Sequence, residues 1–266
     1  MTKERPPAHA GTFYPADPDT LGSLVRSLFK TEGAKNISEV NPDSLRALIV
    51  PHGEFHRSGA VAASAYCLLR KRSRPPERVV IVAPFHDWSE YGLILPTYPA
   101  FRTPIGSLPV DRKTIQKLAF FSETLFSDEA HLSEFSIEVQ LPFLHYLWES
   151  VPIVPIGYAD IPSEILAHVL EPLVLNPDTL TLVSADFSRY LNARDAERTD
   201  GESFGKILSH LAVDPLKVCG ANGMNALSIL ARNHHLSPRL LSAVHAESDT
   251  EGSAQVTGYA TFGFIG

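Results

Sequence analysis

The sequence predicts an α/β protein whose central sheet is mixed, mostly parallel and covered by helices on both faces. Short apolar runs, bounded by proline, glycine or polar residues, alternate along the chain with helical patterns. The last two apolar runs follow one another without an intervening helix, which predicts an antiparallel strand pair. The sequence contains no internal repeat, low-complexity tract or linker, so we expect a single domain over residues 1–266.

Composition narrows the class of protein. The 266 residues are 44% hydrophobic and 20% charged, as in ordinary globular proteins. A net charge of −7 disfavours a nucleic-acid partner or an anionic membrane surface. No apolar run approaches the roughly 20 residues that span a bilayer, and the N-terminus lacks the apolar stretch of a secretory signal. With only Cys67 and Cys219, we expect no disulfide framework and a cytoplasmic location.

The first third of the chain begins with an extended, proline-marked segment. A helix is predicted at 17–30, with Asp17 as N-cap and Pro18 in the first turn. Residues 32–44 have the composition of a loop. Strands are then predicted at 45–51, at the end of 74–84 and at 91–98, with a helix at 58–72.

The rest of the chain continues the alternation. The segment 103–111 predicts a turn with a short strand, and 112–120 a helix. Residues 133–149 have helical periodicity with an interruption at Pro142. Further strands are predicted at 151–158 and 179–186, helices at 163–173, 201–211 and 214–233, and the closing strands at 239–249 and 254–266.

Three polar side chains stand at the ends of predicted strands, namely His52, His86 and Asp186. In α/β folds ligands bind at the carboxyl ends of the strands, so these side chains share a crevice if their strands are neighbours. Two neutral imidazoles are suitable ligands for Zn, Cu, Fe or Ni. Alternatively, both are structural histidines, as most of the 11 histidines must be, and Asp186 is an N-cap or turn former.

The two cysteines lie in different contexts. Cys219 is in "KVCGANGMNAL", where a thiolate would be stabilised by the positive end of a helix and would suit a soft metal. The alternative is a buried structural cysteine at a tight glycine turn. Cys67 lies in the apolar part of a predicted helix and is expected in the core.

Nine short strings, read together, resemble one family. In chain order they are "HAGTFYP", "VPHGEFHRSGAVAASAY", "VAPFHDW", "FRTPIGSLPVD", "SIEVQLPFL", "VPIVPIG", "VSADFSRY", "VCGANGM" and "VTGYATF". The chain is identified by them as a member of the Memo family, whose bacterial members are called AmmeMemoRadiSam system protein B. The resemblance covers nearly the whole chain. It implies a fold similar to the class III extradiol, LigB-type dioxygenases.

The resemblance also implies a metal site of two histidines and one cysteine. Matched motif by motif, the ligands are His52 in "PHGEF", His86 in "APFH" and Cys219 in "VCGANG". Iron is expected before copper, and the same ligands also suit zinc. Asp186 and Glu138 are expected to support the site, Glu138 by orienting a ligand imidazole; otherwise Glu138 is a carboxylate on a helix surface. The family name implies a functional link to AMMECR1-like and radical-SAM proteins.

Several positions depart from the family's usual motifs. Arg189 and Phe135 each stand where the family has a histidine, and Glu54 and Phe55 replace a glycine and a tyrosine. Arginine does not exchange protons near neutral pH, so the classical acid–base residue of extradiol cleavage is absent. Arg189 is instead expected to pair with Glu54 or Asp186, or to bind a carboxylate or phosphate. Glu54 and His56 are candidates to replace the lost base.

Three functions compete at this point. The first is a mononuclear metalloprotein with redox or oxygenase-like activity on a small substrate. The second is a non-catalytic module that binds a small molecule or a peptide through Arg189, since family members have been described as binding phosphorylated peptides. The third, a metal hydrolase, is weaker, because the sequence has no "HExxH" motif or serine nucleophile elbow.

Overall fold

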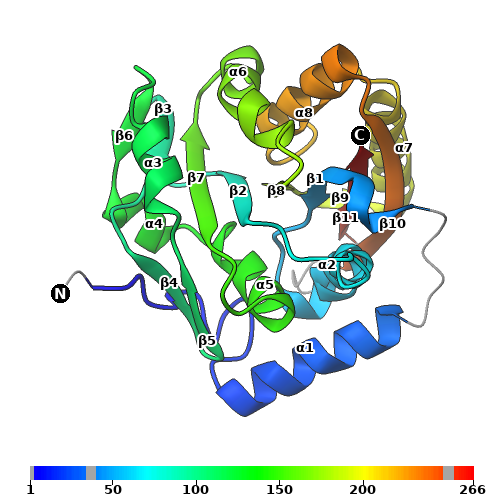
Figure 1. Cartoon of the computed structure of the whole chain (residues 1–266). Helices are drawn as coiled ribbons and strands as arrows, with labels where there is room; N and C mark the ends of the chain where they lie inside the picture. Colours follow the sequence, from blue (N-terminus) through cyan, green and yellow to red (C-terminus); the bar gives the residue numbers. More distant parts are fainter. Residues whose placement is uncertain (1–2, 34–39, 248–254) are drawn as a thin grey trace.

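A mixed sheet forms the centre of the computed structural model, which describes residues 3–33, 40–247 and 255–266 (Figure 1). Within these residues the strand order is β10-β11-β1-β8-β2-β7-β3-β6, and the short β9 pairs with β11. The predicted α/β class is confirmed. The sheet contains both parallel and antiparallel pairs.

The middle of the sheet consists of parallel strands. They are β1 (Leu45–Val50), β8 (Thr179–Ser184), β2 (Arg78–Pro84) and β7 (Ile153–Ala159). Their side chains are almost continuously apolar and buried, because helices cover both faces of a parallel sheet. In this register Val50 lies opposite Ser184, so that β1 and β8 end side by side.

Antiparallel pairs flank the parallel strands. β11 (Gln255–Ile265) runs antiparallel to β1 and to β10 (Ser237–Glu247), so the closing strand pair is confirmed. Residues 248–254, which the predicted strands include in part, lie outside the described residues. The other strands are β3 (Gly92–Leu95), β6 (Thr124–Phe126), β9 (Leu191–Asn192) and a separate hairpin of β4 (Ala100–Thr103) and β5 (Gly106–Pro109).

Helices lie on both faces (Figure 1). One face carries α2 (Phe55–Leu69), α1 (Pro18–Gly33) outside it and α5 (Leu141–Leu147); the other carries α6 (Ser163–Val174), α7 (Ala193–Leu208) and α8 (Ala221–His234). Two short helices, α3 (Arg112–Leu118) and α4 (Asp128–Ser133), pack near β7 and β3. The Asp17 carboxylate accepts from the Thr20 backbone N–H at 2.8 Å, which confirms the predicted N-cap.

Three helices begin in the structure seven or eight residues away from their predicted first residue. The predicted helix 201–211 begins earlier, at Ala193, because the Asn192 side chain caps it by accepting from the Asp195 N–H at 3.0 Å. The predicted helix 133–149 consists of an irregular segment, a 3₁₀ turn at Glu138–Gln140 and α5, so Pro142 stands in the first turn of α5 rather than interrupting a longer helix. A proline is well placed there, since the first helical N–H groups have no partner within the helix.

The predicted helix 214–233 begins only at Ala221. Gly220, directly before it, has a φ of +81°, in the left-handed region that favours glycine. A side chain on Gly220 would also approach the Cβ atom of Ala185 to 2.8 Å. The chain before α8 is therefore an irregular segment that passes close to the end of β8, and this segment carries Cys219.

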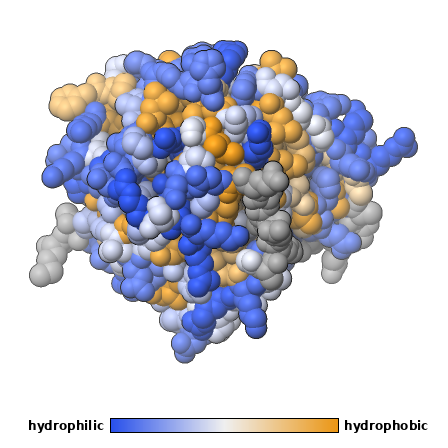
Figure 2. Space-filling view, turned by 45° about the vertical axis from the view of Figure 1, so that its right-hand side comes forward, coloured by the Kyte–Doolittle hydropathy of each residue, from blue (hydrophilic) through white to orange (hydrophobic). Residues whose placement is uncertain are grey.

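The surface combines hydrophilic side chains with scattered hydrophobic ones, as Figure 2 shows for one face. Exposed hydrophobic side chains include Phe120 and Leu216. Among the described residues, no helix is long and apolar enough to cross a membrane.

Candidate metal centre

The polar residues predicted at strand ends meet at one edge of the sheet. β8 lies between β1 and β2, and all three strands run parallel. His52, His86 and Asp186 follow these strands by two residues each, so they leave the sheet at the same carboxyl edge. The Asp186 carboxylate lies 3.5 Å from Nε2 of His52.

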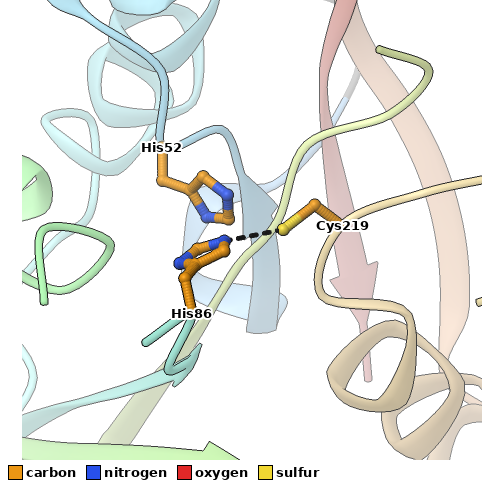
Figure 3. Close-up of side chains that lie close together, drawn as sticks. All are labelled: His52, His86 and Cys219. Carbon is orange, nitrogen blue, oxygen red and sulfur yellow. Dashed lines mark hydrogen bonds between the residues drawn. The ribbon is translucent and has the colours of Figure 1, made fainter. Parts of the chain in front are cut away.

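His52, His86 and Cys219 form a cluster that could hold a metal ion (Figure 3). One ligand atom from each residue, two imidazole nitrogens and the Cys219 Sγ, lies within 4.8 Å of the other two. Nε2 of His86 is 3.0 Å from Sγ. His52 and Cys219 are brought together although more than half the chain separates them in sequence.

A two-residue backbone bridge places Cys219. The Cys219 N–H donates to the carbonyl of Asp186 at 2.9 Å, and the Asp186 N–H donates to the carbonyl of Cys219 at 3.2 Å. The segment before α8 is thus attached to the end of β8. This attachment requires the close approach that Gly220 permits.

Hydrogen bonds fix the orientation of the His52 ring. The Ser184 hydroxyl donates to the carbonyl of Ser136 at 2.7 Å, so its oxygen accepts from Nδ1 of His52 at 3.2 Å. The Nε2 lone pair of His52 therefore faces the centre of the cluster. His52 is fully buried, and burial lowers the pKa of its imidazole, which favours the neutral form that a metal requires.

Glu134 fixes the ring of His86. Its two carboxylate oxygens lie 3.1 and 3.2 Å from Nδ1 of His86, and one of them also accepts from the His86 backbone N–H at 2.7 Å. Burial would raise the pKa of the Glu134 carboxyl, but the contacts with His86 outweigh it and lower the pKa to about 2. With Nδ1 held by Glu134, Nε2 of His86 points to Cys219 (Figure 3).

Glu134, and not Glu138 as predicted, orients one of the two imidazoles. The Glu138 carboxylate is fully buried, so it is not a surface group, and it accepts from Arg5 at 2.5 Å, from the N–H of His9 at 2.9 Å and from the Tyr14 hydroxyl. The groups that donate these hydrogen bonds all belong to the N-terminal segment, and neither His52 nor His86 is among them. Nothing in the sequence distinguishes the two glutamates, since they stand four residues apart in one segment.

The protonation states of Cys219 and His86 are coupled. Burial would raise the pKa of the Cys219 thiol, but His52, His86 and Arg189 outweigh it and lower the pKa to about 6. Burial would lower the pKa of His86, but hydrogen bonds with Cys219 and Glu134 raise it to about 10. Without a metal, the pair at neutral pH is a thiolate beside an imidazolium, and a metal would displace the imidazolium proton.

Arg189 and Asp186 adjoin the cluster. Nη2 of Arg189 donates to the Asp186 carboxylate at 3.3 Å and lies 3.3 Å from Nε2 of His52. Asp186 also accepts from the His52 backbone N–H at 2.8 Å. Of the two partners expected for Arg189, the structure thus brings Asp186 to it, whereas Glu54 forms an ion pair with Arg57 at 3.5 Å.

Phe135 forms an aromatic wall at the site. Its ring stacks on His86, with centroids 4.9 Å apart and planes at 12°, and meets His52 edge-on at 5.7 Å. The other side of Phe135 stacks on Phe13 at 4.2 Å. At the position where the resemblance leads us to expect a histidine, this chain therefore supplies an apolar surface and no ligand atom.

A small polar hollow of about 160 Å³ opens in front of His52. Glu54, Arg57, Arg189 and Tyr259 are among its walls. Gly53 is needed here, because a Cβ atom at this position would lie 2.6 Å from the Tyr259 ring. Of the two residues expected to replace the lost base, Glu54 lines the hollow, whereas His56 is exposed in the first turn of α2.

Known proteins resemble this chain over nearly its whole length. A family model described as "Memo-like protein" matches residues 5–261. The chain belongs to the Memo family. A MEMO1 family protein of Methanopyrus kandleri is 32% identical over 98% of this chain and 99% of its own length, and one of Metallosphaera sedula is 32% identical over 96% and 97%.

One solved structure shares the fold of this chain at a much lower sequence identity. The crystal structure of an uncharacterised protein from Escherichia coli K12 superimposes with a TM-score of 0.53 at 14% identity, covering 83% of this chain and 99% of that chain. At this identity the likeness concerns the fold alone. The chain and that protein therefore share their overall fold.

Proposed function

We propose that this Memo-family protein binds one metal ion through His52, His86 and Cys219 and uses it for redox or oxygenase-like chemistry on a small substrate. The observation that carries the proposal is the convergence of three ligand atoms within 4.8 Å. Ligands at 2.0–2.3 Å from one metal lie about 3–4 Å apart, so only a small adjustment of the side chains is needed.

The donor set suits a transition metal. The thiolate character of Cys219 and the Nε2 lone pair of His52 supply two donors, and His86 becomes the third when its Nε2 proton leaves. Glu134 supports His86 in the way that carboxylates commonly support metal-bound imidazoles. Iron is our first expectation, followed by copper and zinc, and a redox-active metal would supply electron transfer.

The surrounding residues limit the chemistry. Arg189 stays protonated, so it neither accepts nor donates a proton during a reaction. It would bind an anionic substrate group and balance the charge of Asp186. Phe135 excludes water from one side of His86. The arrangement supports substrate positioning beside a metal better than acid–base ring cleavage.

The decisive experiment measures metal in the protein as isolated. The protein is purified without added metal, and iron, copper and zinc are quantified for the wild type, His52→Ala and Cys219→Ala. His168→Ala is the matched control, because His168 is exposed on α6. We expect both site variants to lose metal and the control to keep it. Unchanged metal content in both site variants would refute the proposal.

A second function is supported by Arg189. Its guanidinium borders the crevice, and its two hydrogen-bond contacts within the described part of the chain both use one nitrogen, Nη2. A binding module for a small acidic molecule or a phosphorylated peptide is therefore the alternative. Calorimetric titration of the wild type and Arg189→Ala with such ligands tests it. Equal affinity in the two proteins would remove the basis of this alternative.

The cellular setting is also proposed from the family resemblance alone. We expect a cytoplasmic protein that works with AMMECR1-like and radical-SAM proteins. Copurification of a tagged chain from its own host tests this link. Recovery of neither class of protein would count against it.

A further inference from the structure

A second and larger hollow has one of the three proposed ligands, Cys219, in its wall. It encloses about 470 Å³ between α7, β9 and the segment before α8, and Cys219 and Arg189 are among its walls. Pockets of roughly 300–1,000 Å³ are the usual size for small-molecule ligands. Arg189 also lines the small hollow at His52, so its side chain lies between the two.

The walls of this cavity are partly apolar. Leu191 and Val218 line it beside the fully buried Phe187, and Leu216 stands at its rim with its side chain almost fully exposed. A ligand with an apolar body of modest size would remove these side chains from water, which favours binding. The small hollow at His52 has only about a third of this volume, so a ligand with an apolar body fits the larger cavity better.

Three cations line the cavity, namely Arg189, Arg198 and Lys217, together with the acid Asp195. Two of these cations are already in ion pairs, Arg198 with Asp195 at 3.2 Å and Lys217 with Glu202 at 3.0 Å. An anionic ligand would therefore be bound by Arg189 rather than by a general positive charge of the cavity.

Arg189 is the side chain best placed to bind the anion. It is 37% exposed, and among the described residues its hydrogen bonds to protein use only Nη2. Nη1 and Nε are left for a second partner, in the forked geometry that matches a carboxylate. The nearby carboxylates of Asp186 and Asp195 disfavour a dianion, so a monocarboxylate fits better than a phosphate.

We propose that this cavity is the substrate pocket of the metal centre and that it takes a small monocarboxylate with an apolar body, held at its carboxylate by Arg189. This inference rests on the proposed function, because the metal and the substrate would both contact Cys219. A ligand in this cavity would lie on the opposite side of Arg189 from the small hollow at His52.

Benzoate is a suitable probe, and its binding is measured by calorimetry on the full, chelator-treated chain. Benzyl alcohol and phenyl phosphate are the neutral and dianionic comparisons. We expect saturable benzoate binding and at least tenfold weaker binding of both analogues. Absence of benzoate binding at millimolar concentration, or tighter binding of phenyl phosphate, would overturn the proposal.

Two variants locate the binding site. Arg189→Gln removes the charge-assisted hydrogen bonds and should weaken benzoate binding about ten- to hundredfold. Leu216→Glu removes an apolar side chain from the rim and adds a negative charge, so it should weaken binding as well. Leu175→Glu is the control, since Leu175 is a partly exposed leucine at the end of α6, outside the cavity walls. Wild-type affinity in Arg189→Gln, or equal affinity in the two leucine variants, would overturn the proposal.

The same proteins separate this proposal from the metal proposal. Arg189 is not a proposed ligand, so Arg189→Gln should keep its metal while it loses benzoate. A wild-type chain that binds benzoate but never holds a metal would refute the metal site and leave the cavity assignment standing.

Discussion

Glu134 is the residue that links one proposed metal ligand, His86, to the rest of the segment 131–138. Its oxygens accept from the backbone N–H groups of His86, Phe135 and Ser136 at 2.7–3.0 Å, besides contacting the His86 ring. Few conformations satisfy all these bonds at once. The orientation of His86 therefore depends on this one carboxylate.

Replacing Glu134 by glutamine should weaken metal binding. The variant keeps the shape of the side chain but loses the charge that makes His86 a better donor, and changes of this kind typically cost about 10–100-fold in metal affinity. Competition with a chelator measures the affinity. Glu164→Gln, on the exposed side of α6, is the control and should bind metal as the wild type does. Equal affinity in the two variants would contradict the role assigned to Glu134.

The two cysteines should differ in reactivity in the metal-free protein. Cys219, with a pKa lowered to about 6, is mostly thiolate at pH 7, whereas burial raises the pKa of Cys67 to about 11. Alkylation of Cys219 by iodoacetamide should therefore rise through pH 6 and level off above pH 7, while Cys67 stays unmodified. Mass spectrometry of peptides after timed alkylation gives both rates. A Cys219 rate that keeps rising up to pH 9 would contradict the lowered pKa.

The family motifs predict all three proposed ligands, and the strand ends independently favour His52 and His86. His52 and His86 follow apolar strands, and the strand alternation places those ends at one edge of the sheet. Glu134 was missed for a physical reason. Whether Glu134 or Glu138 faces a histidine depends on which of them pairs with Arg5, and that contact joins residues 133 positions apart.

At the scale of elements, the segment between Asp186 and α8 determines where the thiolate lies. Periodicity predicts a helix from residue 214, because "DPLKV" has a favourable start signal and apolar spacing. The bridge between Asp186 and Cys219 competes with that helix, and Gly220 allows the turn that follows. Local pattern cannot reveal a pairing with a distant strand.

Gly220→Ala tests this element. The added Cβ atom would lie 2.8 Å from the Cβ atom of Ala185 and 3.0 Å from the carbonyl oxygen of Ser184, at a φ that disfavours alanine. We expect the free energy of unfolding to fall by about 1–3 kcal/mol and metal affinity to fall with it. Urea denaturation and chelator competition give the two quantities.

Gly205→Ala is the matched control for that substitution. Gly205 lies inside α7, and a Cβ atom there would meet nothing within 4 Å. Alanine should therefore stabilise the protein by about 0.5–1 kcal/mol, because it loses less backbone entropy in a helix. Destabilisation of both variants to the same extent would show that the close approach at Gly220 is unimportant.

At the scale of the molecule, the N-terminal segment is attached to the segment that carries Glu134. Arg5 is 1% exposed, and its guanidinium donates to the carbonyls of His131 and Glu134 as well as to the Glu138 carboxylate. Glu138 in turn accepts from the backbone N–H groups of Ala8 and His9. The first residues of the chain thus support the metal site without contacting it.

Arg5→Met should be strongly destabilising. It leaves the Glu138 carboxylate buried without its cation, and breaking a buried pair in this way costs about 3–5 kcal/mol. Chemical denaturation measures the loss. The double variant Arg5→Met/Glu138→Met removes both charges and should lose less than the sum of the single variants. Additive losses would mean that the two side chains do not act as a pair.

Because the backbone bridge to Asp186 holds Cys219 at the end of β8, a metal ion bound there would cross-link distant segments of the chain. Two of the proposed ligands, His52 and His86, come from the first third of the chain and Cys219 comes from the last, so a bound ion would tie together segments that meet only after the sheet is complete. The unfolded chain cannot offer this set of donors at one point. At a free metal concentration 100 times the dissociation constant, binding would therefore stabilise the native state by about 2.7 kcal/mol. Chelation would loosen the contact between the β8 end and the start of α8 first.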